Sequence, residues 1–193
     1  MIFDNKLSMK QQSSQICQSA YLELSRISSI RHVLTLVLPR LDYCNFLLSG
    51  IPQQLIDKLQ KVQNCSARLI FKTSKRTHVS PLLAKLHWLP IAQRIGYKIS
   101  SLCYDVVSDT APLYLSDLLC LYIPSRSLHS PADTRIFQIP TRKKKFQGWR
   151  AFSHLSPVTW NKLPYSVHHA QTQSQFKTQL KTTLFRSVYE PDS

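Results

Sequence analysis

Glycine is almost absent from this sequence. The chain has 193 residues and only three glycines, Gly50, Gly96 and Gly148. A glycine-rich phosphate loop needs several glycines within a few positions, because only glycine lets the backbone approach a phosphate so closely. The sequence therefore excludes a nucleotide-binding loop of that kind.

Acidic residues are also scarce. There are 10 Asp and Glu against 25 Lys and Arg, and no Asp-Asp pair occurs. Polymerases and nucleases that use two divalent metals need clustered carboxylates to hold them. We therefore expect no such catalytic centre, and a chain that is not an enzyme.

The formal net charge is +15, which favours nucleic acid or another anionic surface as a partner. The charge is unevenly spread, because residues 51–100 carry nine Lys or Arg against Asp57 alone, whereas residues 101–120 carry three acids and no base. A basic protein without a polyanion partner is the alternative that composition leaves open.

Metal-binding and disulfide patterns are missing too. The cysteines are widely spaced, and none has the C-x-x-C spacing of a zinc site. Their mostly apolar neighbours predict buried, reduced thiols. His168 and His169 are interpreted as surface residues in preference to metal ligands. We expect no metal and no cofactor. The five cysteines are Cys17, Cys44, Cys65, Cys103 and Cys120.

Two side-chain pairs have the residue types of a nucleophilic site, Cys103 near Asp105 and Ser153 beside His154. Neither has the spacing of a known nucleophile turn, and neither has a third member. A structural role is the preferred interpretation of both pairs.

No apolar run approaches the roughly 20 residues that a membrane-spanning helix needs. The opening residues, MIFDNKLSMKQQ, lack the pattern of a signal peptide. We expect an intracellular chain, nuclear or cytoplasmic, with no membrane partner.

The stretch from residue 41 to 71 is the clearest structural signal. Residues 41–48 read as the end of a buried helix, Ser49-Gly50 supplies a helix stop, and Pro52 suits the first turn of a second helix. Apolar or small residues then recur at three- and four-residue steps, the period of a helix face that packs on a core. These positions are Leu55, Leu59, Val62, Ser66 and Leu69.

An amphipathic helix is predicted upstream, from about residue 8 to residue 38, where Pro39 interrupts it. Together with the helix at 52–71 it predicts a helical bundle over residues 1–74. Residues 75–193 predict a second, mainly helical domain. Its expected helices start at Ser80-Pro81, Ile91 and Pro112 and cover 155–163 and 176–185.

A small β-hairpin is predicted inside the second domain, with residues 134–140 and 145–150 as its arms. Trp88 is interpreted as a packing residue in preference to a base-stacking one. The predicted fold class is mainly α, a helical bundle followed by a helical C-terminal domain with this hairpin.

Several short motifs then occur in a fixed order. They are LDYCN at 41–45, LQKVQN at 59–64, LHWLP at 86–90, APLYLSDL at 111–118, YIPSRSL at 122–128 and WNKLP at 160–164. In this order they resemble the region behind the polymerase palm in reverse transcriptases of LINE-type, jockey-like non-LTR retrotransposons.

The resemblance covers nearly the whole chain, and it implies that residues 1–74 are a thumb-like bundle, shortened around residues 31–40. In the family the catalytic aspartates lie upstream of this region. The resemblance therefore implies a truncated, non-catalytic remnant of a transposable element.

Two basic surfaces are the candidate sites for RNA or DNA, bound without sequence preference. One is a helix stripe of Lys58, Lys61, Arg68 and Lys72. The other combines cations with an aromatic ring suited to unpaired bases, and consists of Arg142, Lys143, Lys144, Lys145, Trp149 and Arg150.

Two alternatives remain open at the level of sequence. One is a protein-interaction module that binds a partner or a second copy through apolar surface left by the missing palm. The other is a decayed open reading frame without a selected function.

Overall fold

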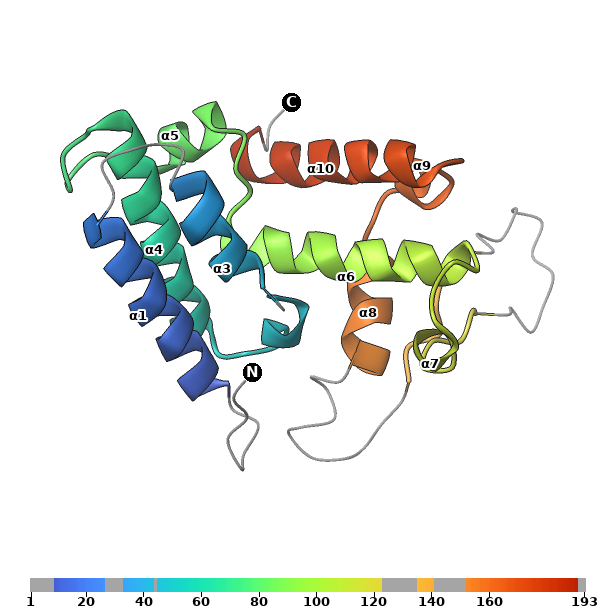
Figure 1. The fold of residues 1–193 in the computed structure, drawn as a ribbon. Helices are drawn as coiled ribbons and strands as arrows, with labels where there is room; N and C mark the ends of the chain where they lie inside the picture. The colour runs from blue at the N-terminus through green and yellow to red at the C-terminus, as the bar shows by residue number, and fades with distance from the viewer. Residues whose placement is uncertain (1–8, 27–32, 44, 123–134, 141–151, 191–193) are drawn as a thin grey trace. The chain divides into compact units, whose positions relative to one another are not determined.

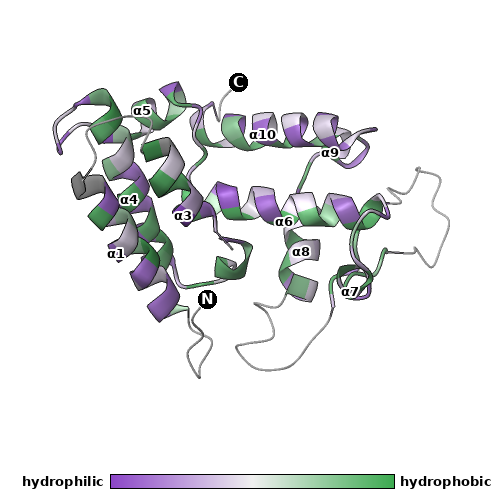
Figure 2. Ribbon diagram, viewed as in Figure 1, coloured by the Kyte–Doolittle hydropathy of each residue, from purple (hydrophilic) through white to green (hydrophobic). Residues whose placement is uncertain are grey.

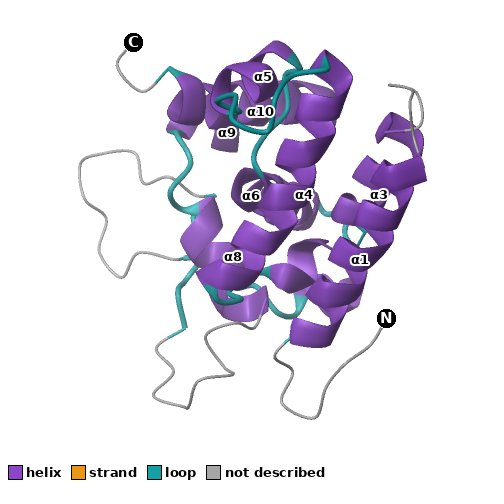
Figure 3. Ribbon diagram, turned by 90° about the vertical axis from the view of Figure 1, so that its left-hand side faces the viewer, coloured by secondary structure: helices purple, strands orange, loops and turns teal. Residues whose placement is uncertain are grey.

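The structure is a computed structural model that describes residues 9–26, 33–43, 45–122, 135–140 and 152–190. It is mainly helical, as predicted (Figure 1). Figure 3 shows helices and loops and no strand within the described ranges. The longer helices are α1 (Lys10–Arg26), α4 (Gln53–Phe71), α6 (Ile91–Val107), α8 (Phe152–Trp160) and α10 (Gln173–Tyr189).

Short elements connect the long helices. They are the π-helical turn η1 (Val33–Val37), α3 (Leu38–Asp42), the 3-10 turn η2 (Asn45–Leu48), α5 (Ser80–Lys85), α7 (Leu113–Ser116) and α9 (Tyr165–His168).

The chain forms two compact units. The first unit contains residues 1–95 and 185–193, and the second contains residues 96–184. The boundaries therefore fall inside α6 and inside α10. The domain boundary expected near residue 74 stays a prediction.

The first unit is built on α1 and α4, which lie side by side (Figure 1). Apolar and polar residues alternate along both helices, as Figure 2 shows. Ala20 of α1 and Leu59 and Val62 of α4 are fully buried, so the apolar stripe of each helix has a partner. Arg40 of α3 is paired with Glu23 of α1 at 3.2 Å.

The ends of α4 follow from its sequence. Gly50 has a φ of 68°, which glycine adopts without strain, and Pro52 is the N-cap. At the other end Lys72 is left-handed, and its N–H donates to Arg68 and Leu69 carbonyls. Leu55, Leu59, Val62 and Ser66 are buried as predicted, but Leu69 in the last turn is 38% exposed, so its assignment to the core face was wrong.

Pro39 does not interrupt a helix. It lies in the first turn of α3, where its missing N–H is no loss. The structure divides the helix predicted from residue 8 to residue 38 into two elements, α1 and the turn η1. Residues 27–32, between these two elements, lie outside the described residues.

Polar contacts join α4 to the segment that follows α5. The Gln63 side chain, fully buried, donates from Nε2 to the Leu89 carbonyl at 2.9 Å, and the Ile91 N–H donates to Gln60 Oε1 at 2.9 Å. Trp88 is 8% exposed, in line with its predicted packing role, and its carbonyl accepts from the Tyr189 hydroxyl. These bonds hold the LHWLP segment against α4.

The second unit has an aromatic core. Trp160 is fully buried, lies tilted against Phe137 and Phe176, and stacks on His168 with ring centroids 4.8 Å apart. Tyr104 of α6 stacks on Phe176 of α10 at 4.3 Å. Residues from five segments of the chain therefore form one cluster.

His168 was expected at the surface, and this expectation is wrong. The residue is 2% exposed, because its ring stacks on Trp160 and its Nε2 lies 2.9 Å from the Trp160 carbonyl. His169 lies half-buried and stacks on Tyr165. His169 is the residue after the end of α9, where the backbone leaves the helix, so its ring does not follow that of His168 into the core.

The described residues do not contain the predicted β-hairpin. Its second arm, residues 145–150, lies outside the described residues. The first arm pairs elsewhere, in a single antiparallel bridge between Leu121 and Phe137, with Tyr122 N–H donating to Ile136 and Gln138 N–H donating to Cys120. Asn161 fixes this segment, because its side chain accepts from the Phe137 N–H and donates to the Phe137 carbonyl.

Candidate nucleic-acid interface

The helix stripe predicted from sequence is partly assembled by α4. Lys58 and Lys61 are exposed, and Lys72 is exposed just beyond the helix end. The four stripe positions are separated by three, seven and four residues, so they fall on one side of the helix. Burial raises the pKa of the Cys17 thiol on α1, and the positive charge of Lys58 opposes that rise.

Arg68 has a different role from the lysines. Its Nε and Nη2 donate to the Thr77 carbonyl at 3.3 and 3.1 Å, and the residue is half-buried. Its guanidinium therefore ties the connector after α4 back onto the helix. Arg68 is a positioning residue of this surface more than a phosphate contact.

The connector held by Arg68 adds two cations that the sequence-based assignment left out of the site. Lys75 and Arg76 are exposed, and they follow Lys72 within four positions. The sequence shows both cations in a short basic connector, residues 73–77, directly after the helix. The described candidate surface, which we call the α4 basic surface, consists of Lys58, Lys61, Lys72, Lys75 and Arg76.

The second predicted surface was Arg142, Lys143, Lys144 and Lys145 with Trp149 and Arg150. All six residues lie outside the described residues, so their assignment stays a prediction from sequence.

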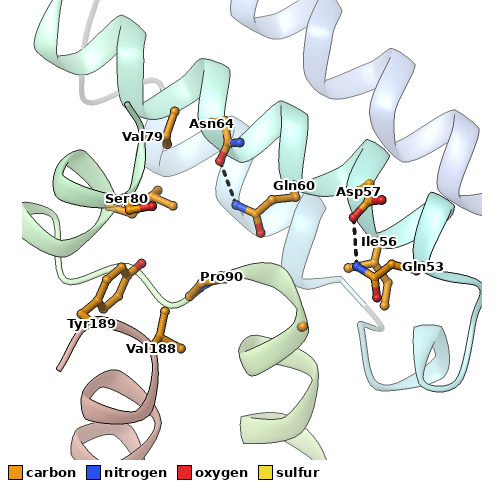
Figure 4. A pocket seen from close by; sticks show the side chains of 12 residues that line it. Gln53, Ile56, Asp57, Gln60, Asn64, Val79, Ser80, Pro90, Val188 and Tyr189 are labelled. Atoms are coloured by element: carbon orange, nitrogen blue, oxygen red, sulfur yellow. Dashed lines mark hydrogen bonds between the residues drawn. The ribbon is translucent and has the colours of Figure 1, made fainter. Parts of the chain in front are cut away.

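A cleft of about 300 Å³ lies on another face of α4, between that helix, the start of α5, the start of α6 and the end of α10 (Figure 4). Its lining contains no Lys or Arg. The polar side chains bond to one another, with Gln60 Nε2 donating to Asn64 at 2.8 Å and Gln53 Nε2 donating to Asp57 at 2.9 Å. Without a cation, this cleft is not suited to a phosphate.

Of the two pairs considered for nucleophilic catalysis, Cys103 and Asp105 have structural surroundings. Cys103 is fully buried, its Sγ lies 3.8 Å from the Ser156 carbonyl, and burial raises its pKa to about 12. A nucleophilic cysteine needs the opposite shift. Asp105 instead accepts a bond from Gln173. Within the described ranges, no three His, Cys, Asp or Glu residues come together as a metal site would require.

Of the four cysteines that the structure describes, Cys17 and Cys103 are buried as expected. Cys65 is half-buried and Cys120 is exposed, with its carbonyl accepting from the Gln138 N–H. Cys44 lies outside the described residues.

Iodoacetamide at pH 8 is expected to alkylate Cys120 and to leave Cys103 unmodified in the folded protein. Alkylation requires a thiolate that the reagent can reach, and Cys103 is buried with a pKa raised to about 12. Peptide mass spectrometry over a time course would measure both sites. In guanidinium chloride the two should react alike, and equal rates in the native protein would contradict the burial of Cys103.

Among the described helices, none is long and apolar enough to cross a bilayer. No family model, no curated protein and no solved structure matches the chain.

Proposed function

We propose that the chain binds RNA or DNA without sequence preference, and that it corresponds to the non-catalytic, post-palm part of a LINE-type reverse transcriptase. The observation that supports binding is the α4 basic surface, five exposed cations from one helix and its connector in a chain of net charge +15. The reverse-transcriptase assignment is supported by the ordered sequence motifs.

The dimensions of the surface suit a nucleic-acid backbone. Residues 58 and 72 are fourteen positions apart, which is about 21 Å along a helix at about 1.5 Å per residue. Phosphates of one strand rise about 3.4 Å each along a duplex axis, so the stripe is about as long as six base pairs. Lysine ammonium groups on flexible stems can contact phosphates along such a span without reading bases.

One acid lies on α4. Asp57 is exposed, and its Oδ1 accepts from Gln53 on the side of the helix that lines the cleft of Figure 4. Because Asp57 also precedes Lys61 by four positions, one carboxylate lies beside the basic face of α4.

Replacing Lys58, Lys61 and Lys72 with Gln is expected to weaken duplex binding and to flatten its salt dependence. Each neutralised phosphate contributes a slope of about −0.9 in log affinity against log salt, so three lost contacts change the slope by between about two and three units. Fluorescence anisotropy with a labelled duplex over a salt series would measure both quantities.

The matched control is the K98Q/K177Q/K181Q variant, which removes three equally exposed lysines from α6 and α10. It should bind nearly as the parent does, with a small loss from the lower net charge. An equal effect of both variants would mean that net charge alone drives binding, and the α4 basic surface would not be a site.

A further inference from the structure

A short segment after α6 exposes large apolar side chains. Leu113 is 81% exposed, Tyr114 68% and Leu118 46%, and Leu121 and Tyr122 continue the pattern at 46% and 50%. Isolated exposed leucines are ordinary, but five large apolar side chains within ten positions form a patch of the kind found at interaction sites.

The same segment is the acidic part of a basic chain. No Lys or Arg occurs between Lys98 and Arg126, while three of the 10 acids, Asp105, Asp109 and Asp117, do. Asp109 and Asp117 are exposed, and they flank Leu113 and Tyr114. We call Asp109, Leu113, Tyr114, Asp117 and Leu118 the acidic apolar patch.

The backbone under this patch is fixed by hydrogen bonds. The Thr110 and Ala111 N–H groups both donate to the Asp105 carbonyl, and Pro112 caps α7. Leu119, directly after the patch, is 7% exposed and anchors it, and Cys120 accepts from the Gln138 N–H. A patch held in this way loses little conformational entropy when a partner binds.

The end of α4 has the opposite charge and a similar apolar content. Leu69 and Phe71 are 38% and 37% exposed, and Lys72, Lys75 and Arg76 follow them, all exposed. Arg68 holds this connector through the Thr77 carbonyl. We call Leu69, Phe71, Lys72, Lys75 and Arg76 the basic apolar patch.

We propose that the chain self-associates, with the acidic apolar patch of one copy bound to the basic apolar patch of another. Charge complementarity points to a second copy as the partner, because the basic apolar patch sets exposed cations beside exposed apolar side chains and the acidic apolar patch sets exposed acids beside them. Both patches are small, so the association is weak and depends on concentration.

The two patches differ in their expected response to salt. Attraction between exposed charges is screened at moderate ionic strength, whereas contacts of Leu113 and Tyr114 with Leu69 and Phe71 are not. Self-association should therefore weaken with salt and persist in part. Because Lys72, Lys75 and Arg76 also belong to the α4 basic surface, an excess of oligonucleotide should dissociate the oligomer.

The test uses the full chain after nuclease treatment, so that no nucleic acid bridges copies, and light scattering coupled to gel filtration at tens of micromolar. The parent should exceed the monomer mass. The D109K/D117K variant and the K72E/K75E/R76E variant should each raise the midpoint concentration more than about tenfold, since both place like charges opposite each other.

Combining the two sets in one chain restores opposite charges and should restore the oligomer. Mixing the two separate variants leaves one intact pair of patches and one pair in which both charges are reversed, so the mixture should associate although neither variant associates alone. Rescue of this kind is not explained by unfolding or by net charge.

Two further variants serve as controls. K98E/K177E/K181E makes the same charge change as K72E/K75E/R76E at exposed positions outside the patches, and it should associate as the parent does. L113S/Y114S keeps the net charge and should weaken association. A parent that stays monomeric, or a combined variant that is not rescued, would overturn the proposal, and neither result would touch the binding of nucleic acid.

Discussion

Replacing Trp160 with alanine is expected to lower the free energy of unfolding of the second unit by about 3–5 kcal/mol, the range for a fully buried large aromatic residue. This is a large part of the 5–15 kcal/mol that typically holds a domain together. We therefore expect the second unit to lose its fixed structure.

The contacts of Trp160 explain the size of the effect. Its side chain is fully buried, its Nε1 donates to the Arg135 carbonyl at 2.6 Å, and its ring contacts His168 and Phe176. Truncation leaves a cavity among the aromatic rings and removes the hydrogen bond to the half-buried Arg135 carbonyl, and each change is destabilising. Trp160→Phe should cost less, because it retains most of the ring volume.

Guanidinium chloride titration followed by circular dichroism would measure the loss. Amide hydrogen exchange would show which part of the protein is destabilised, since α8, α9 and the first half of α10 should lose protection before α1 and α4 do. Tyr114→Ala is the control, at a position that is 68% exposed, and it should change stability by less than about 0.5 kcal/mol. A Trp160→Ala variant as stable as this control would contradict the aromatic core.

The helices were predictable where one local pattern decides the outcome. The apolar period of α4 and the glycine before it gave the helix and its start, because both act over a few residues. Leu69 shows the limit of such a pattern. A period tells which side of a helix faces the core, but it does not tell where the packing partner ends, and Leu69 lies in the last turn.

Contacts between distant segments were not predictable. Nothing local indicates that Asn161 bonds to Phe137, or that Arg68 bonds to the Thr77 carbonyl in the connector that carries Lys75 and Arg76. The prediction that Pro39 interrupts a helix failed for a related reason. The sequence showed a proline near the end of a helical pattern, and only the fold shows that a new helix starts there.

The candidate interface was therefore half predictable. The positive charge and the spacing of Lys58, Lys61 and Lys72 can be read from the sequence. All three lysines are exposed, as a surface that binds phosphates requires. The role of Arg68 depends on a backbone carbonyl nine positions away, which a charge pattern does not include. A guanidinium that donates to its own chain has fewer N–H groups left to donate to a phosphate.

Replacing Lys143, Lys144 and Lys145 with Gln is expected to weaken binding to single-stranded oligonucleotides and to flatten the salt slope by roughly two units. Each contact to a single strand contributes about −0.7 to the slope, so three contacts account for this change. Little sequence preference should be lost, because phosphate contacts carry none. Trp149→Ala tests stacking separately, since a stacked base contributes about 1–3 kcal/mol and we expect this contribution to depend little on salt.

The comparison with K58Q/K61Q/K72Q makes the test specific, because each variant removes three charges. The α4 set should matter more on duplex, where a helix can follow a backbone, and the 143–145 set should matter more on single strands, where unpaired bases can stack beside it. Measuring four affinities, two variants on two substrates, separates a site effect from a net-charge effect. If the 143–145 variant binds a single strand as tightly as the parent at low salt and with the same slope, these lysines form an ordinary solvated turn, and single-strand binding has to be sought on the α4 basic surface.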